Sequence, residues 1–229
     1  MEQCKKCNGT TWIFRKDSGG YEWAEPCECR EKAISLKLLA SSGISEEDSK
    51  KGFAGFNTFN ESVLVNAKNT ATSYFQNFAK MESERVNSIM LCGASGRGKT
   101  TLGMAIANNL ISSGVGVRYM PYRDSVTDLK QLLGHENKSL YKDKMYRLQN
   151  ARVLFIDDLL KGKVTESDIN IMYEIINYRY LQRKPVIIST EKTIEELLAF
   201  DEAIGSRLIE MSKGYIITFD SSVPNYRLR

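Results

Sequence analysis

One glycine-rich segment constrains the fold of this 229-residue chain more than any other, and it reads Gly93-Ala94-Ser95-Gly96-Arg97-Gly98-Lys99-Thr100. The apolar run at residues 88–92 predicts a buried strand before it, and the apolar residues of 101–112 predict a helix after it. Glycines let a backbone wrap closely around an anion, and the N-terminus of a helix attracts negative charge. A strand, a glycine-rich loop and a helix in this order predict a phosphate-binding loop of a nucleotide site.

The loop fits the pattern G-x-x-x-x-G-K-[ST], which assigns a task to individual side chains. Lys99 is expected to reach the β- and γ-phosphates and to act in catalysis, and Thr100 is expected to bind Mg²⁺. The predicted ligands are therefore ATP, its product ADP, and Mg²⁺. The residues expected to bind the nucleotide are Gly93, Ala94, Ser95, Gly96, Arg97, Gly98, Lys99, Thr100 and Thr101.

Further apolar, β-branched runs follow the loop at regular intervals, at residues 117–120, 153–157, 185–189 and 215–219. Stretches with helical spacing separate them. Strands that alternate with helices are typical of parallel sheets, because a parallel connection has to cross over one face of the sheet. The chain is therefore predicted to form a doubly wound α/β domain with five parallel strands.

Two adjacent carboxylates end the third of these strands, at Asp157 and Asp158. A nucleotide-hydrolysing site of this type needs a carboxylate beside its Mg²⁺, and Asp157 fits that role. Asp158 is then expected to point toward the γ-phosphate and to orient or deprotonate the attacking water. The alternative is that Asp158 only caps the next turn, a common role for aspartate.

Four of the five cysteines form two close pairs near the N-terminus, Cys4 with Cys7 and Cys27 with Cys29. This spacing is near that of four-cysteine zinc sites, with the second pair one residue tighter. A segment of about 30 residues cannot bury a core without such a crosslink, so we predict Zn²⁺ bound by these thiolates. The alternative is a set of free or redox-active thiols. The predicted boundaries are a zinc-binding domain at 1–45, a linker at 46–55 and an ATPase domain at 56–229.

Composition and charge narrow the class of protein without deciding it. The formal net charge of +4 permits contact with nucleic acid but is far from that of a polybasic protein. No apolar run approaches the length of a membrane span, and residues 1–9 contain no apolar core of a signal peptide. We therefore expect a cytoplasmic protein without a membrane partner.

Taken together, these segments resemble the AAA+ replicative-helicase loaders of the DnaC and DnaI type, with related phage proteins and the transposition ATPases of the IstB type. The resemblance runs from the cysteine pairs to Phe219, and its most specific parts are GASGRGKT, LFIDDL, PVIISTEKTIEEL and AIGSRLIEM. It implies an AAA+ domain without the full helical lid. It also implies self-association through this domain.

The resemblance implies a function as well: ATP-dependent loading of a hexameric DnaB-type replicative helicase onto single-stranded DNA during replication initiation. The N-terminal cysteine region would then be the helicase-docking part. One alternative is an IstB-type transposition ATPase that binds duplex DNA. Another is a zinc-containing nucleic-acid adaptor whose phosphate-binding loop is only structural.

Two further site predictions follow from the same resemblance. Arg207, in the GSR segment, looks like the arginine finger that completes a neighbouring subunit's site, although an arginine is more often a solvated surface charge. Many relatives have Thr-Ser-Asn where this chain has Ser189-Thr190-Glu191. An ionised Glu191 cannot donate a hydrogen bond to a phosphate, so we expect slow hydrolysis or a sensing role for Thr190.

Single-stranded DNA is expected to contact the segment that follows the second strand of the sheet. The candidate residues are Arg118, Tyr122, Arg123 and Lys130. Cations can pair with phosphates there, and an aromatic ring can stack on a base. The alternative is that the tyrosine packs in the core and the cations are solvated.

Overall fold

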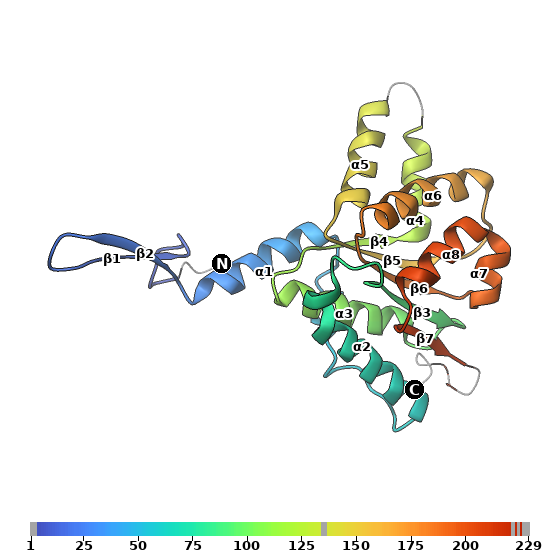
Figure 1. Cartoon of the computed structure of the whole chain (residues 1–229), viewed down its shortest axis with the longest axis horizontal. Coiled ribbons are helices and arrows are strands. Elements are labelled where there is room, and N and C mark those ends of the chain that lie inside the picture. The colour runs from blue at the N-terminus through green and yellow to red at the C-terminus, as the bar shows by residue number, and fades with distance from the viewer. Residues whose placement is uncertain (1–3, 134–136, 221–222, 224, 226–229) are drawn as a thin grey trace.

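A computed structural model describes residues 4–133, 137–220, 223 and 225 of the chain. Figure 1 shows a narrow β-hairpin at one end, a helix that leads away from it, and a larger α/β body. The hairpin contains β1 (Trp12–Lys16) and β2 (Glu22–Pro26), and the helix is α1 (Cys29–Ser42). The nucleotide loop lies in the body, far along the chain from the hairpin.

The body is built around five strands in the order β4-β5-β6-β3-β7. All four neighbouring pairs are parallel, so the carboxyl ends of the strands lie along one edge of the sheet. This confirms the predicted five-stranded α/β fold. The strands are β3 (Ile89–Gly93), β4 (Val117–Pro121), β5 (Val153–Leu159), β6 (Val186–Thr190) and β7 (Ile216–Phe219).

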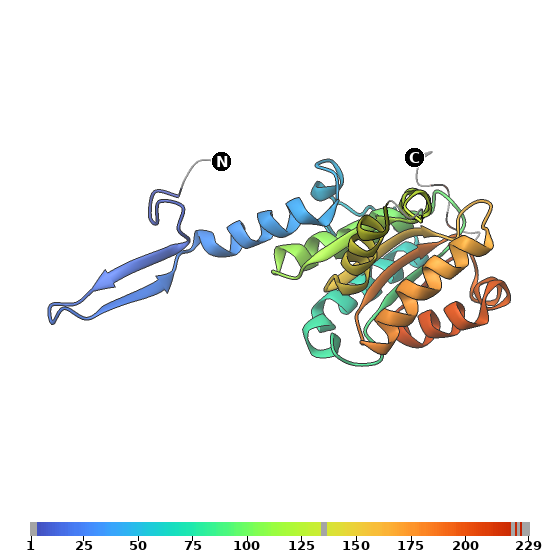
Figure 2. The ribbon, with the colours of Figure 1, turned by 90° about the horizontal axis from the view of Figure 1, so that it is seen from above.

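Helices cover both faces of this sheet, as the view from above shows (Figure 2). Side chains alternate between the faces, so Ile89 and Leu91 pack in one core while Met90 and Cys92 pack in the other. This explains why the strands are apolar throughout instead of alternating with polar residues. The helices are α2 (Ser62–Met81), α3 (Lys99–Ser112), α4 (Tyr122–Gln131), α5 (Lys138–Asn150), α6 (Glu166–Leu181), α7 (Ile194–Phe200) and α8 (Glu202–Met211).

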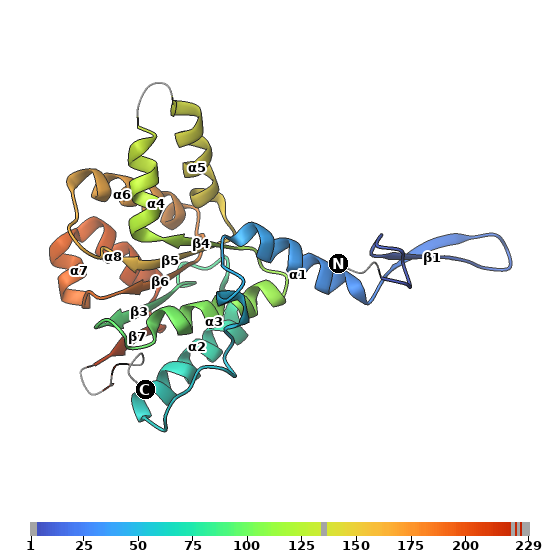
Figure 3. The same cartoon turned by 180° about the vertical axis from the view of Figure 1, so that it is seen from behind.

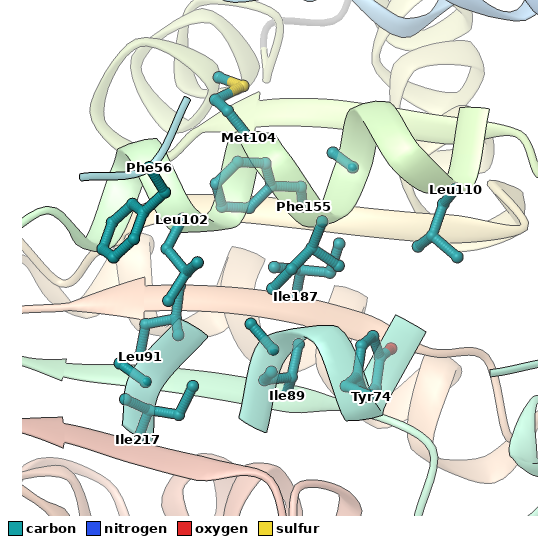
Figure 4. Packing of buried hydrophobic residues seen from close by; sticks show 14 of the residues in the cluster. Phe56, Tyr74, Ile89, Leu91, Leu102, Met104, Leu110, Phe155, Ile187 and Ile217 are labelled. Atoms are coloured by element: carbon teal, nitrogen blue, oxygen red, sulfur yellow. The ribbon is translucent and has the colours of Figure 1, made fainter. Parts of the chain in front are cut away.

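The core between the sheet and helices α2 and α3 sets the position of the helix that follows the nucleotide loop (Figure 4). Gly103 of α3 lies directly against the ring of Phe155, and a Cβ atom there would be 2.4 Å from the ring carbon Cζ. The glycine therefore lets α3 approach β5 closely. This close approach brings the first turn of α3 beside the carboxylates at the end of β5.

The C-terminal part of α1 and the segment after it pack on the body, and Figure 3 shows this from behind. Helix α1 packs against α3 and β4, and the Ser35 hydroxyl donates to the carbonyl of Ser112 over 3.2 Å. Within the predicted linker, the short helix η1 (Asp48–Lys50) is held by Asn108, whose amide donates to the carbonyls of Asp48 and Lys51. The segment predicted to be a linker, residues 46–55, is thus packed against the body. The predicted domain boundaries at residues 45 and 56 stay a prediction.

The resemblance also predicted that the chain has no full helical lid. That prediction concerns the residues after Phe219, most of which lie outside the described part.

A buried arginine connects the end of helix α5 to the sheet. The spacing of apolar residues in the sequence does not predict it. Arg179 of α6 has no exposed surface, and burial lowers the pKa of its guanidinium. A helix end leaves carbonyl groups without intrahelical partners and carries partial negative charge, which a cation satisfies. The guanidinium donates to the carbonyls of Leu148, Gln149, Ala151, Arg152 and Pro185.

We predict that Arg179→Leu lowers the free energy of unfolding by about 3 kcal/mol, because it leaves several buried carbonyls without a donor. Urea denaturation followed by circular dichroism measures this change. The control Arg147→Leu alters an exposed position on α5 and should change stability by less than about 0.5 kcal/mol. Equal stability of the two variants would contradict the structural role of Arg179.

Candidate nucleotide-binding site

The glycine-rich loop connects β3 to α3 at the carboxyl edge of the sheet. Gly93, Gly96 and Gly98 all have positive φ angles, of 139°, 76° and 91°. A Cβ atom on Gly93 would lie 2.3 Å from the carbonyl oxygen of Phe219, so only glycine fits at that position. The loop ends where α3 begins at Lys99, and the N-terminus of that helix faces the space that the loop encloses.

Lys99 lies inside this loop and is almost completely buried. Its ammonium donates to the carbonyl of Ala94 over 2.9 Å. Burial lowers the pKa of Lys99, and the carboxylates of Asp158 and Glu191 partly oppose that shift. A phosphate oxygen in the loop would supply the negative charge that this buried cation needs. A small cavity opens there, lined by Ser95, Gly96, Gly98, Lys99, Thr100, Thr101 and Asp158.

Asp157 is buried at the end of β5 and accepts hydrogen bonds from three elements. Its carboxylate accepts from the hydroxyls of Thr100, Ser189 and Tyr119. Burial raises the pKa of Asp157, while the bonds from Ser189 and Thr100 counteract this effect. The 2.9 Å contact with Thr100 joins the two side chains that we assign to Mg²⁺. A hydroxyl and a carboxylate side by side are oxygen donors of the kind that Mg²⁺ prefers.

Asp158 lies next to this pair and has a different environment. Its φ angle of +56° is uncommon for a residue with a side chain, and its backbone N–H donates to the Ser189 hydroxyl over 2.8 Å. This conformation turns the half-buried carboxylate toward the cavity that Lys99 also lines. The side chain therefore lines the same cavity as Lys99, and its role in orienting an attacking water stays a prediction.

Two residues in this site were missed by sequence reasoning. Ser189 bridges Asp157 and the backbone of Asp158, and Tyr119 donates to Asp157 over 3.0 Å. A serine inside an otherwise apolar strand was the available signal for Ser189, because a buried hydroxyl needs a partner. Tyr119 gave no such signal, since a tyrosine in a strand is ordinary.

Two other predicted residues have bonding partners of their own in the structure. Thr190 is buried, and its hydroxyl donates to the carbonyl of Leu159 and accepts from the N–H of Lys192. Its predicted sensing role would require those bonds to rearrange. Arg207 of α8 donates to the carbonyl of Ala203 over 2.6 Å and lies 5.4 Å from the rings of Tyr173 and Tyr180. Its role in a neighbouring subunit's site stays a prediction.

The four N-terminal cysteines converge at the base of the hairpin, with all their sulfur atoms within 4.8 Å of one another. The Sγ atoms of Cys4 and Cys27 are 3.8 Å apart, and those of Cys7 and Cys29 are 3.4 Å apart. Tetrahedral zinc with bonds of about 2.3 Å places sulfurs about 3.8 Å apart, so the donor set fits Zn²⁺. None of these cysteines forms a disulfide. Burial raises the pKa of Cys7, but hydrogen bonds from Cys29 and from backbone N–H groups outweigh it and lower that pKa to about 7.

Three of the four residues expected to contact DNA lie together. Tyr122, Arg123 and Lys130 line one cavity beside α4, whereas Arg118 lies at a different one with Arg147 and Arg152. Tyr122 is only 1% exposed and packs in the core, so its ring has no face for stacking on a base. Its buried hydroxyl has no hydrogen-bond partner among the described residues. Lys130 pairs with Asp168 over 2.8 Å.

Comparison with known proteins assigns the chain to a family. The model of the IstB-like ATP binding protein family matches residues 58–210, which include the loop, both aspartates and Arg207. The chain belongs to this family of IstB-like ATP-binding proteins. It is also 38% identical over 215 residues to the protein YqaM of Bacillus subtilis (strain 168), covering 90% of this chain and 67% of YqaM. The phage-like element PBSX protein XkdC of the same organism is 37% identical over 221 residues, covering 93% and 81% of the two chains.

Two solved structures of other proteins share the fold of this chain. The crystal structure of DnaI superimposes with a TM-score of 0.65 at 20% identity, covering 83% of this chain and 100% of the other. The crystal structure of the DnaC helicase loader gives a TM-score of 0.58 at 21% identity, covering 77% and 100%. This chain therefore has the AAA+ fold of these proteins, as its motifs predicted. Among the described residues, no helix is long and apolar enough to cross a bilayer.

We predict that Cys27→Ser removes the bound zinc, because three thiolates and a hydroxyl hold Zn²⁺ far less tightly than four thiolates. Elemental analysis of the purified protein should fall from about one zinc per chain to a small fraction of that. The control is Cys92→Ala, which changes a buried cysteine in β3 away from the cluster. Unchanged zinc content in Cys27→Ser would contradict the four-cysteine site.

Proposed function

We propose that this protein is an ATP-dependent loader that places a hexameric DnaB-type replicative helicase on single-stranded DNA. The observation that carries the proposal is the combination of two parts in one chain. An ATP-binding body shares its fold with DnaI and with the DnaC helicase loader, and a cysteine-bearing hairpin projects from that body (Figure 1). A projecting module lets a protein hold a partner while its ATP-binding body changes state.

The surface of the hairpin supports a docking role. Four large apolar side chains are exposed on it, Trp12, Phe14, Tyr21 and Trp23, and Phe14 and Tyr21 are 76% and 71% exposed. The two short strands of the hairpin form no core of their own, so zinc would stiffen the base from which these side chains project. Aromatic side chains on a stiff element are suited to a protein interface, because little conformational entropy is lost on binding.

The body supplies the nucleotide chemistry in this proposal. Residues 93–101 hold the phosphates, and Thr100 and Asp157 are the ligands for Mg²⁺, which would neutralise phosphate charge when bound. Asp158 orients the attacking water. Arg207 completes the site of a neighbouring subunit, so hydrolysis requires self-association through the body. This arrangement makes a single chain a weak ATPase and couples turnover to assembly.

We predict that the protein forms a stable complex with the hexameric replicative helicase of its host in the presence of ATP and Mg²⁺. Size-exclusion chromatography with light scattering measures the mass of the complex. Cys27→Ser should abolish the complex, whereas Cys92→Ala should retain it. The absence of a complex with and without nucleotide would contradict the loader proposal.

Contact with single-stranded DNA is assigned to the cavity beside α4. Arg123, Lys130 and Lys163 line it, and a phosphate group of the strand would pair with these cations. The Asp168 carboxylate neutralises one of the three cations, which leaves a positive excess. The structure of the replication initiator DnaA bound to AMPPCP and single-stranded DNA shares the fold at a TM-score of 0.60 and 19% identity, covering 76% of this chain and 51% of DnaA.

We predict that Arg123→Ala weakens single-stranded DNA binding about tenfold at low salt and makes the salt dependence shallower, because one phosphate contact is lost. Fluorescence anisotropy of a labelled oligonucleotide across a salt series measures both effects. Lys213→Ala, at an exposed site between α8 and β7, removes the same charge elsewhere and serves as the control. If Arg123→Ala left the DNA affinity and its salt dependence unchanged, this cavity would not be a contact site for single-stranded DNA.

A second candidate function is that of a transposition ATPase that coats duplex DNA. The match to the IstB-like family over residues 58–210 favours it. ATP-dependent filaments on duplex DNA, seen by electron microscopy in the absence of helicase, would favour this function. The cysteine hairpin would then have no assigned task, which is why the loader is the preferred proposal.

A further inference from the structure

An ion-paired lysine stands beside the catalytic carboxylate, and neither the motif nor the family model assigns it a role. The Lys161 ammonium lies 2.8 Å from Oδ2 of Asp158 and 3.1 Å from Oε1 of Glu191. These two acids come from the ends of neighbouring strands, β5 and β6. Lys161 therefore joins the carboxylate that lines the nucleotide cavity to the acid that directly follows β6.

The backbone after β5 is shaped to bring this lysine back over the site. Asp158 and Leu160 both have positive φ angles, of 56° and 59°, and the N–H of Lys161 donates to the carbonyl of Asp158 over 3.1 Å. Left-handed conformations at two non-glycine residues are costly and persist only where the surroundings hold them. The side chain of Lys161 is thus directed toward the edge that carries the nucleotide loop and not along the strand.

Lys161 shares the electrostatic environment of the phosphate site. Asp158, its partner, lines the cavity together with Lys99. Burial has the largest effect on the pKa of Lys99 and lowers it, while the charges of Asp158 and Glu191 raise that pKa and the charge of Lys161 lowers it. Hydrogen bonding to Asp158 raises the pKa of Lys161, so this lysine is a permanent cation at neutral pH. Since its side chain is 39% exposed, an arriving anion has access to it.

We propose that Lys161, held in place by Glu191, contacts the γ-phosphate of bound ATP and so lets the protein distinguish ATP from ADP. The inference rests on the proposed nucleotide site and assigns its sensing group. An ammonium has three donors, and one of them bonds to Asp158. Glu191 holds the same ammonium as an ion pair at 3.1 Å, and its Oε1 accepts no hydrogen bond among the described residues. Donor capacity therefore remains for a phosphate oxygen.

This assignment gives Glu191 a role that suits an ionised carboxylate, which is to position the ammonium of Lys161. An ionised glutamate cannot donate to a phosphate, and on its own it would repel one. Paired with Lys161, it becomes a positioning residue that holds a cation beside the nucleotide cavity. The same lysine holds the Asp158 carboxylate, so arrival of the γ-phosphate would redistribute the bonds of the residue expected to orient water.

The test compares the affinities of the full-length protein for ATP and for ADP, measured with Mg²⁺ by displacement of a fluorescent nucleotide. We expect Lys161→Ala to weaken ATP binding on the order of tenfold and to leave ADP binding within about twofold, since ADP has no group at that position. Lys161→Arg should retain most of the preference for ATP. Glu191→Gln should reduce the preference less than Lys161→Ala does. Lys213→Ala is the matched control for loss of a positive charge.

Equal losses of ATP and ADP affinity in Lys161→Ala, with Lys161→Arg behaving in the same way, would overturn the inference and indicate a structural role. An unchanged ratio of the two affinities combined with faster hydrolysis would also overturn it, because Lys161 would then only mask Asp158. If the unaltered protein bound neither nucleotide, the proposed nucleotide site itself would be wrong. Normal binding by the unaltered protein with no change in Lys161→Ala would remove only this inference.

Discussion

The buried carboxylate of Asp157 is the interaction on which the geometry of the site depends. Four elements meet at this one group, since β5 carries it and hydroxyls from α3, β4 and β6 donate to it. A buried carboxylate without these donors would be strongly destabilising, so the bonds constrain all four elements together. The nucleotide loop, the predicted metal ligands Thr100 and Asp157, and Asp158 are consequently held in one arrangement.

The parallel sheet explains why these groups can meet at all. Because its strands run in the same direction, the loop after β3 and the acids after β5 and β6 lie at one edge. Close packing of Gly103 against Phe155 then lets the first turn of α3 reach Asp157. At the opposite edge, Arg179 anchors the end of α5 to the start of β6 and stabilises the sheet from which the site projects.

The loop, the five strands and the cysteine cluster were predictable from short patterns, because each depends on neighbours in the chain. Glycine spacing, apolar runs and paired cysteines carry local signals. The environments of Thr190 and Tyr122 were not predictable in this way. Thr190 bonds to the backbone and Tyr122 is buried, and both facts depend on elements distant in sequence. The segment expected to be a linker packs on Asn108 for the same reason.

The sequence by itself determined the fold class, the family and the types of residue available for phosphate, magnesium and zinc. Those properties follow from local spacing, since a glycine-rich loop between a strand and a helix has few other uses. Only the tertiary structure decided which side chains act together, as with Ser189 on Asp157 and with Lys161 between Asp158 and Glu191. The physical reason is that strand order and the left-handed turn after β5 set these distances, and neither is encoded in the spacing of any single motif.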